Sequence, residues 1–529
     1  MKILMVHQMT DVDRLSTEIY RIPPLILMEN AGRAVLEEVM EVSQGLEGLP
    51  ALIFCGRGNN GGDGLVVARH LAVRGARPEI VLMSDPSSYR GEALANWEIV
   101  HAMGIPVRIL GAPSAARRQL RTLGDPRVVV DALFGTGLSK PIGSDIRPVV
   151  QWINQAAARA AVVSVDIPSG LFADSPCVPG PAVRAQRTVT FTALKVALVL
   201  PPACDLAGRV KVAPIGSPTE LLGNPEYRTE LVDEAIVRQT LPRRARDSHK
   251  GAYGHLYVIA GSRGKSGAAL MTGHAALRSG AGLVTLLLPS GLQRDVVGRV
   301  PELMTEPMPE TEAGTLASSG LDEVLSHLEE ADAVVVGPGL TTHPETRDLV
   351  HEVVRRSPVP VVLDADGINA FAPKPERLRN EMGQTVTITP HPGEMARLVG
   401  CTISEVQSRR LETASGASRE HGFFTVLKGF QTVVAAPDGR VLVNPTGNPG
   451  MATGGSGDIL AGMIGRFVAG WRRRFRGADL RALSDHLAAA VYLHGRAGDI
   501  AAKEVGEESL VATDLLPRLP AAFLSVFDR

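Results

Sequence analysis

Short aliphatic runs recur along this chain at intervals of roughly 20 to 40 residues, and segments with helical spacing separate them. Runs of this kind suit the buried strands of a parallel sheet, and the intervening segments suit the crossover helices of βαβ units. The pattern therefore predicts an α/β protein with mostly parallel sheets. In the first part of the chain we expect an amphipathic helix at 25–42 and strands at 51–55, 79–83, 128–131, 161–166 and 188–191.

The same pattern starts again after a break at 214–251. There we expect strands at 255–260, 283–288, 333–336, 359–364, 386–389 and 423–428. A chain of 529 residues is also too long for a single hydrophobic core. We therefore expect two domains, at 1–225 and 226–529, each a three-layer α/β/α sandwich, with a Rossmann-like arrangement in the first.

The charge of the chain bears on its partners, and its cysteines bear on the compartment in which it works. The net charge is −1, so we expect neither nucleic acid nor a membrane surface as a partner. The basic stretch Arg243-Arg244-Ala245-Arg246 suggests a nucleic-acid contact when taken alone, but in a neutral chain we interpret it as a solvated linker. The four cysteines are widely spaced, and neither a membrane-length apolar run nor a secretory signal is present. We expect a cytoplasmic protein with free thiols.

The segment 448–462, NPGMATGGSGDILAG, is the most informative motif for function. Its small residues allow backbone N–H groups to approach an anion closely, and the following helix adds the positive end of its dipole. Asp458 would then stand beside a bound phosphate as a proton acceptor, which is the arrangement required for phosphoryl transfer to a hydroxyl. The alternative for an isolated motif of this kind is a surface loop with Asp458 as the helix N-cap.

A second glycine-rich segment follows the first expected strand. Residues 56–64, GRGNNGGDG, lead into a helix that we expect at 65–74. The segment is neither a dinucleotide fingerprint nor a P-loop. Its side chains, those of Asn59, Asn60 and Asp63, suit contacts with ribose, an amide or a cation. The alternative is an elaborate turn.

Two further strands of the first part end in acids, Asp131 and Asp166. Because ligands of open parallel sheets bind beyond the carboxyl ends of the strands, we expect these loops to converge on the first glycine segment. Asp131, Asn60 and Ser169 offer oxygen ligands for a monovalent cation, and Asp166 remains available for proton transfer. Taken singly, an aspartate at the end of a strand is more often a cap or turn residue, but three such loops in one domain favour a site.

In the second part of the chain, the expected strands at 255–260, 333–336, 359–364, 386–389 and 423–428 each end in a glycine-rich or polar loop. Residues 261–267, GSRGKSG, superficially suggest a P-loop, but the spacing is too short, and a loop that lets substrate approach the sheet is the better interpretation. His391, between two prolines, is a ligand candidate or a structural hydrogen-bonding residue. Lys428 either contacts a phosphate or extends its ammonium group to solvent at a strand end.

The motifs of the first part resemble one family. LMENAG, NNGGDG, DALFGTGL and VDIPSGL together resemble the NAD(P)H-hydrate epimerase domain, over most of residues 10–215. The resemblance implies a potassium site at Asn60, Asp131 and Ser169, with Asp166 as the proton shuttle. The sequence departs from the family pattern at two positions. Gln186 stands where an acid is usual, and Ala197, two residues after Lys195, stands where glycine is usual. The implied contacts with the hydrated nucleotide are Asn59, Asn60, Gly61, Gly62, Asp63, Gly135, Thr136, Gly137, Leu138 and Asp166.

The motifs of the second part resemble another family. GPGL, DADGIN, TPHPGE, LKG and NPGMATGGSGDILAG together resemble the ADP/ATP-dependent NAD(P)H-hydrate dehydratase domain, which has a ribokinase-like fold, over about residues 240–525. The implied substrate contacts are Ala268, Gly339, His391 and Asp458. The implied adenine nucleotide contacts are Lys428, Gly429, Phe430, Gln431, Thr432 and Gly457, among which Phe430 and Gln431 follow the family pattern least clearly.

The two resemblances together imply repair of hydrated NADH and NADPH. Phosphorylation of the hydroxyl on carbon 6 turns it into a leaving group, with Asp458 as the base and Mg²⁺ shielding the phosphoryl charge. ADP or ATP would be the donor, and the resemblance favours ADP. The epimerase would let both R and S forms be recovered, and we expect a homo-oligomer. Two alternatives stay open at this point: a small-molecule kinase that leaves a stable phosphorylated product, and a catalytically silent N-terminal binding module.

Overall fold

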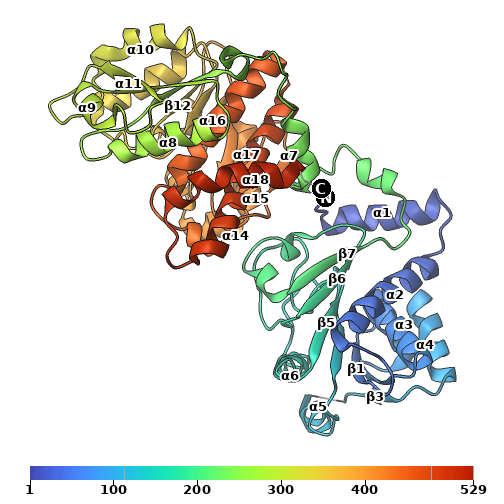
Figure 1. The fold of residues 1–529 in the computed structure, drawn as a ribbon. Helices are drawn as coiled ribbons and strands as arrows, with labels where there is room; N and C mark the ends of the chain where they lie inside the picture. The colour runs from blue at the N-terminus through green and yellow to red at the C-terminus, as the bar shows by residue number, and fades with distance from the viewer. Residues whose placement is uncertain (112, 478, 528–529) are drawn as a thin grey trace. The chain divides into compact units, whose positions relative to one another are not determined.

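The computed structural model describes residues 1–111, 113–477 and 479–527, which divide into two compact units, Met1–Tyr227 and Arg228–Arg529 (Figure 1). Each unit is built on a mostly parallel sheet with helices on both faces. The α/β class predicted from the spacing of the aliphatic runs is confirmed. Among the described helices, none is long and apolar enough to cross a membrane.

The sheet of the first unit has seven described strands, all parallel, in the order β3-β2-β1-β4-β5-β6-β7. The order reverses direction between β1 and β4, so the loops that follow these two strands diverge there and leave a crevice at their carboxyl ends. The strands are β1 (Pro50–Cys55), β2 (Arg77–Leu82), β3 (Val107–Ile109), β4 (Val128–Ala132), β5 (Ala161–Val165), β6 (Arg187–Phe191) and β7 (Arg209–Ala213).

Two apolar clusters hold helices against this sheet. One joins its first face to α2, α3 and α4, and the other joins its second face to α5 and α6 (Figure 1). The amphipathic helix expected at 25–42 is confirmed as α2. The described helices of the unit are α1 (Val6–Glu18), α2 (Pro24–Ser43), α3 (Asn59–Val73), α4 (Gly91–Ala102), α5 (Pro113–Leu120) and α6 (Arg147–Ala156).

The sheet of the second unit has ten described strands in the order β11-β10-β9-β12-β13-β14-β15-β16-β17-β8. Its order reverses between β9 and β12, and only the pairs β15–β16 and β16–β17 are antiparallel among the described strands. The strands are β8 (Thr229–Leu231), β9 (His255–Ile259), β10 (Leu283–Pro289), β11 (Met304–Met308), β12 (Ala333–Val336), β13 (Val361–Leu363), β14 (Val386–Ile388), β15 (Phe424–Leu427), β16 (Val433–Ala435) and β17 (Val441–Val443).

The helices of the second unit also form two layers. One layer packs α7, α8, α16, α17 and α18 on one face, and the other packs helices from α10 to α15 on the opposite face. The described helices are α7 (Glu234–Thr240), α8 (Ser266–Arg278), α9 (Gln293–Val296), α10 (Leu321–Leu328), α11 (Pro344–Arg356), α12 (Asp366–Asn369), α13 (Pro392–Val399), α14 (Ile403–Ser408), α15 (Arg410–His421), α16 (Ser456–Phe475), α17 (Leu480–Val505) and α18 (Leu519–Phe527).

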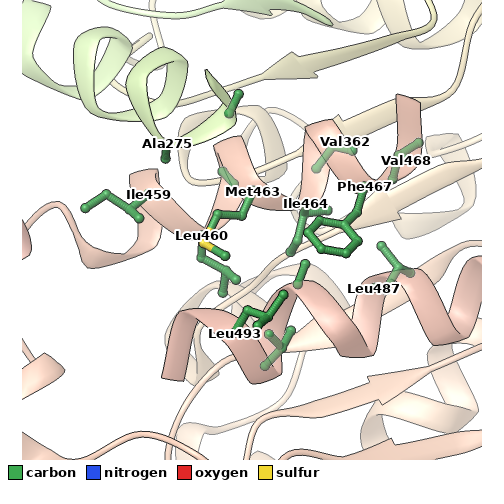
Figure 2. Packing of buried hydrophobic residues seen from close by; sticks show 14 of the residues in the cluster. Ala275, Val362, Ile459, Leu460, Met463, Ile464, Phe467, Val468, Leu487 and Leu493 are labelled. Carbon is green, nitrogen blue, oxygen red and sulfur yellow. The ribbon is translucent and has the colours of Figure 1, made fainter. Parts of the chain in front are cut away.

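Helix α16 lies at the centre of the first of these layers. Ile464 and Phe467 project from α16 among side chains of α17, and Val362 of the sheet lies beside them (Figure 2). On the faces toward α8 and β12, α16 carries glycines: a Cβ on Gly462 would lie 2.0 Å from the carbonyl oxygen of Thr272. The close packing of α16 fixes its first turn in place.

Candidate functional site

In the first unit a cavity of about 890 Å³ lies beyond the carboxyl ends of β1, β4, β5 and β6. This is the point at which the strand order reverses and at which ligands of open α/β sheets bind. The structure brings together here the predicted residues Asn59, Asn60, Asp63, Gly135, Thr136, Gly137, Leu138 and Asp166.

The glycine segment after β1 is shorter than its sequence suggests. Helix α3 begins at Asn59, not at residue 65, so the prediction of a loop through Gly64 is wrong. The reason is packing: a Cβ on Gly61 would lie 1.8 Å from the carbonyl oxygen of Gly56, and one on Gly62 would lie 2.7 Å from the sulfur of Met28. These glycines let the first turns of α3 approach neighbouring elements, and the Asn59, Asn60 and Asp63 side chains lie at a helix N-terminus.

Asp166 forms a buried ion pair that the sequence analysis did not include in the site. Lys195 Nζ donates to Asp166 Oδ1 at 2.8 Å and also to Thr190 Oγ1 at 2.7 Å. The Lys195 side chain is 1% exposed and lines the cavity with Asp166. Asp166 has a backbone φ of 65°, which an aspartate rarely adopts, so the backbone holds this carboxylate at some energetic cost.

Two more carboxyl groups line the same cavity, Asp63 of α3 and Asp13 of α1. Burial raises the pKa of Asp13 to about 6, while Lys195 opposes this rise and Asp166 adds to it. Burial raises the pKa of Asp63 well above its usual value, and the charges of Asp166 and Asp13 raise it further. The site therefore combines an ion-paired carboxylate with carboxyl groups that retain protons at unusually high pH.

The predicted cation ligands lie beside this cavity. Asp131 is fully buried and accepts hydrogen bonds from Ser164 Oγ, Ser169 Oγ and Ser169 N. Burial raises the pKa of Asp131, and no described cationic side chain forms an ion pair with it. Asn60 lies against the loop after β4, since a Cβ on Gly135 would be 3.1 Å from Asn60 Oδ1. A buried carboxylate without a counter-charge, close to neutral oxygens, fits a monovalent cation.

In the second unit, the carboxyl ends of β13, β14 and β15 bring a lysine and two acids together. Lys428 Nζ donates to Asp364 Oδ1 at 2.6 Å and lies 3.9 Å from Glu394 Oε2. Burial alone would lower the pKa of Lys428, but Asp364 and Glu394 raise it above its usual value. Thr389 Oγ1 donates to the same Asp364 oxygen at 2.6 Å. Lys428 is therefore an anchored internal ammonium group, and the interpretation of a side chain reaching out to solvent is wrong.

Asp458 lies in the first turn of α16, close to this cluster. Burial raises the pKa of Asp458 to about 6, the charge of Asp364 adds to the rise, and Lys428 opposes it. The N-cap of α16 is Gly455, with φ 96°, and Asp458 does not cap the helix, so the N-cap alternative is wrong. A Cβ on Gly457 would lie 3.3 Å from Lys428 Nζ. The N-terminus of α16, with its free N–H groups, therefore faces the lysine.

Ala268 and Gly339 are adjacent to each other near the same helix end. A Cβ on Gly339 would lie 3.1 Å from the Ala268 Cβ, and one on Gly455 would lie 2.7 Å from the Met271 side chain, one turn further along α8. Ala268, Gly339 and the start of α16 thus form a continuous group of small residues beyond β9 and β12.

His391 is the N-cap of α13, where its Nδ1 accepts hydrogen bonds from the N–H groups of Gly393 and Glu394. Burial, with the charges of Lys428 and Arg397, lowers the pKa of His391, so the ring is neutral at neutral pH. His391 therefore has a structural hydrogen-bonding role, and its half-exposed ring remains available to a ligand, so the predicted ligand contact stays a prediction.

The remaining predicted nucleotide contacts follow Lys428 in the turn between β15 and β16. Phe430 is exposed, and Thr432 Oγ1 donates to the Gly429 carbonyl at 2.9 Å. Gln431 has φ 57°, and its side-chain oxygen is buried with no hydrogen-bond partner among the described residues. An acceptor left in this state suits a ligand donor such as an exocyclic amine.

Asp13, Lys195, Asp364 and Glu394 are site residues that sequence reasoning did not single out. Glu394 lies within TPHPGE and Asp364 begins DADGIN, so both carried a signal in the motifs quoted above. Lys195 follows the end of β6 by four residues. Asp13 lies on α1, far from every motif, and only the tertiary structure brings it to the cavity.

Comparisons with known proteins match both units. Residues 256–521 match the family model described as NAD(P)H-hydrate dehydratase, and residues 24–197 match the YjeF-related protein N-terminus. The "Bifunctional NAD(P)H-hydrate repair enzyme Nnr" of Moorella thermoacetica is 44% identical over 516 residues, covering 97% of this chain and 95% of that protein. The protein of the same name from Thermofilum pendens is 39% identical and covers 99% and 96%. A crystal structure of the ADP/ATP-dependent NAD(P)H-hydrate dehydratase of Bacillus subtilis, co-crystallised with ATP and Mg²⁺, has a TM-score of 0.48 at 33% identity and covers 56% of this chain and 98% of that chain.

Proposed function

The chain belongs to the family of bifunctional NAD(P)H-hydrate repair enzymes, and from this premise we propose which of its residues perform each step. The protein interconverts the R and S forms of hydrated NADH and NADPH and dehydrates the S form with an adenine nucleotide as co-substrate. We assign epimerisation to residues 1–225 and dehydration to residues 226–529. ADP is the phosphoryl donor that we expect, with AMP and phosphate as products.

Epimerisation takes place in the cavity that contains Asp166 and Lys195. Inversion at a carbon that carries a hydroxyl and a ring nitrogen requires a bond at that carbon to break and re-form. Loss of the hydroxyl proton lets the C–N bond open to an aldehyde while the ring nitrogen takes up a proton, and closure on the other face of the aldehyde reverses both proton transfers. The ion-paired Asp166 takes the proton, and Lys195 holds that carboxylate in place. Asp63 and Asp13, whose pKa values are raised, act as proton donors. The observation that supports this assignment most strongly is the buried Asp166–Lys195 pair in the wall of this cavity.

Asn59, Asn60 and Asp63 line that cavity and position the hydrated nucleotide from one side, and the buried Gly61 and Gly62 let this turn of α3 lie close to its neighbours. The loop containing Gly135, Thr136, Gly137 and Leu138 covers the nucleotide from the other side. K⁺ at Asn60, Asp131 and Ser169 would balance the buried Asp131 charge and keep these two segments together. Its role is structural and electrostatic, and the proton steps belong to the side chains.

Dehydration takes place at the first turn of α16. Asp458 accepts the proton of the substrate hydroxyl while the terminal phosphoryl group of the nucleotide is transferred to that oxygen. Phosphate then leaves and the neighbouring ring carbon gives up a proton to it, which restores the double bond of the reduced ring. The N–H groups at Gly457 and its neighbours and the Lys428 ammonium stabilise the phosphoryl charge. The substrate site is lined by Ala268, Gly339 and His391. The nucleotide is held by Gly429, Phe430, Gln431 and Thr432.

Mg²⁺ would accompany the nucleotide here and shield its phosphates. The described residues contain no cluster of three or more His, Cys, Asp or Glu side chains that could hold a metal by itself. Asp364 already accepts hydrogen bonds from Lys428 and Thr389. The site therefore fits an ion bound largely through phosphate oxygens and water, which is the usual manner of Mg²⁺. We expect a homo-oligomer in the cytoplasm, where the four free cysteines stay reduced.

The test is to mix the purified protein with separated epimers of hydrated NADH, K⁺, Mg²⁺ and either ADP or ATP. Return of the reduced-nicotinamide absorbance is followed together with phosphate release. We expect both epimers to be recovered with one nucleotide preferred. Asp166→Asn should abolish interconversion but leave dehydration of the S form, whereas Asp458→Asn should abolish dehydration but leave interconversion.

Matched controls are Asp125→Asn and Asp322→Asn, whose carboxylates are 84% and 94% exposed on the first and second unit. Both should retain both activities. An unchanged rate of interconversion in Asp166→Asn, measured above the spontaneous rate, would show that the first unit is only a binding module. A stable phosphorylated product without phosphate release would show a small-molecule kinase.

A further inference from the structure

The second unit contains another cavity, of about 810 Å³, at the opposite end of α16 from Asp458. Its walls come from the segment before β9, the end of α8, the second half of α16 and α18. Arg466 and Arg474 of its lining follow Asp458 by 8 and 16 residues, which correspond to roughly 12 and 24 Å along an α-helix. The cavity is therefore separate from the dehydration site and lies at the amino ends of the strands.

The charge of this cavity is one-sided. Its described lining contains six arginines and two histidines but no aspartate or glutamate. One arginine, Arg473, is paired with Asp332 outside the lining, at 2.7 Å. The lining arginines are Arg243, Arg244, Arg278, Arg466, Arg473 and Arg474. Arg243 and Arg244 belong to the basic stretch interpreted above as a solvated linker. The solvated-linker interpretation therefore omits the contact of these two residues with the cavity wall.

Two guanidinium groups converge at one point of the wall. A Cβ on Gly280 would lie 2.6 Å from Arg244 Nη2 and 3.6 Å from Arg466 Nη2. Among the described residues, the hydrogen bond that Arg244 donates is to the backbone carbonyl of Gly280, at 2.7 Å. Burial lowers the pKa of Arg466 to about 10, and the charge of Arg244 lowers it further. Two like charges held together in a partly buried wall are costly unless an anion lies between them.

Donors at this point also lack acceptors. Arg466 Nε and the buried Ser279 Oγ have no hydrogen-bond partner among the described residues, and Ser279 is 2% exposed. Buried polar groups in folded proteins are almost always satisfied, so groups left open in a cavity wall indicate a missing partner. The oxygens of a phosphate would accept from both guanidinium groups at once, and Ser279 directly precedes the glycine at which these groups meet.

The rest of the wall is apolar and aromatic. Tyr253 lies beneath the Arg244 guanidinium at 3.8 Å, and Phe523 and Phe527 of α18 line the same cavity. A volume of this size is typical of sites for small molecules rather than for macromolecules. We propose that this cavity binds a nucleoside phosphate, with the phosphate groups between Arg244, Arg466 and Ser279 and the base against the aromatic wall.

The test is calorimetric titration of the full chain with the non-transferring ATP analogue adenosine 5′-(β,γ-imido)triphosphate. We expect two sites on the wild-type protein. Lys428→Met should remove the dehydration-site binding alone. Arg244→Gln and Arg466→Met should each weaken the other site roughly 10- to 100-fold, the usual effect of losing a charged hydrogen bond to phosphate. Arg246→Gln is the matched control, because Arg246 is in the same basic stretch but outside the cavity lining.

Inorganic triphosphate and adenosine separate the two parts of the ligand. Triphosphate should bind the second site more weakly than the analogue, and adenosine alone should not bind it measurably. Triphosphate binding as tightly as the analogue would overturn the placement of the base against the aromatic wall. A single site on the wild-type protein, or a second site insensitive to both arginine substitutions, would overturn the proposal. Because Arg466 is partly buried, the thermal midpoint of each variant is measured to show that the protein is folded. Arg244→Gln, whose side chain is exposed, tests the same site without changing a buried position.

Discussion

Asp458→Asn should stabilise the second unit at neutral pH while it abolishes dehydration. The pKa of Asp458 in the folded protein is about 6, against 3.8 for the unperturbed side chain, chiefly because the carboxyl group is buried. Each pKa unit corresponds to about 1.4 kcal/mol, so the ionised carboxylate costs the folded state about 3 kcal/mol at pH 7. Solvent screening of this partly exposed group reduces the expected gain from an uncharged amide to about 2 kcal/mol.

The sign depends on which state binds the proton more strongly. The folded state has the higher pKa, so between about pH 4 and pH 6 it holds a proton that the unfolded state has released. The free energy of unfolding therefore falls as pH rises through this window, and the penalty is complete above it. Asp458→Asn should be more stable than the wild type at pH 7, and the difference should disappear near pH 4.

Scanning calorimetry of the full chain gives the thermal unfolding midpoint of the unit that contains Asp458. The rate of dehydration of the S epimer is measured on the same samples at saturating nucleotide. The wild-type rate should fall about tenfold from pH 7 to pH 5, because the ionised fraction of a group with a pKa of about 6 falls by that factor. The exposed Asp322→Asn variant is the control for both measurements.

Two results would contradict the reasoning. Near wild-type dehydration in Asp458→Asn would remove this residue from the role of base. A lower midpoint in that variant at pH 7 would show that the carboxylate is stabilised in the folded protein, and the raised pKa would then be wrong.

Three further changes test other parts of the structure. Lys195→Met should reduce epimerisation by 10²-fold or more in kcat, measured with the R epimer, since it leaves Asp166 without its partner; an unchanged rate would remove Lys195 from the site. Gly462→Ala should lower the free energy of unfolding, measured in urea, by about 1–3 kcal/mol through overpacking against Thr272, whereas Gly416→Ala, in a helix with open space around it, should raise it by about 0.5–1 kcal/mol. Replacing K⁺ by choline should lower the thermal midpoint of the first unit, and this dependence should vanish in Asp131→Asn; an identical shift in both proteins would exclude Asp131 as a cation ligand.

Most strands buried on both faces were predictable from sequence, and those at the edges were not. Every strand predicted from an aliphatic run is present, with ends shifted by at most two residues, because a strand covered on both faces must be apolar throughout. The edge strands β3, β7, β8 and β11 were missed, and so were the interior strands β16 and β17, which are only three residues long. β7 reads Arg-Val-Lys-Val-Ala and β11 contains Glu306 and Pro307, which is the composition of a strand with one side open to solvent.

The candidate sites were predictable where a motif and a strand end coincide. Asp166 and Lys428 were found in this way, and Asp458 was found from the glycine-rich segment that precedes a helix. The structure places each beside a cavity or a charge cluster. The partners of these residues were not predictable, because a pair such as Asp364–Lys428 depends on two strand ends that lie 64 residues apart. Asp13 shows the limit: its helix carries no motif, and its raised pKa arises wholly from tertiary burial.

The two sites share a charge arrangement although their chemistry differs. In each, one buried ammonium group is bonded to one carboxylate, Lys195 to Asp166 and Lys428 to Asp364, and two further carboxyl groups with raised pKa values lie nearby. A single ammonium group cannot neutralise three carboxylates in a partly buried site, so the carboxyl groups that it does not bond are the ones whose proton affinity rises.

The two sites differ in which carboxyl group performs the proton transfer. In the first unit the proposed base is the carboxylate bonded to lysine, whereas in the second Asp364 takes that place and leaves Asp458 free at the N-terminus of α16. Loss of the lysine should therefore disable the epimerase base directly, but in the dehydratase it should raise the pKa of Asp458, because an opposing charge is removed. We expect Lys428→Met to move the acid limb of dehydration to higher pH, measured at saturating nucleotide, and an unshifted limb would refute this common electrostatic design.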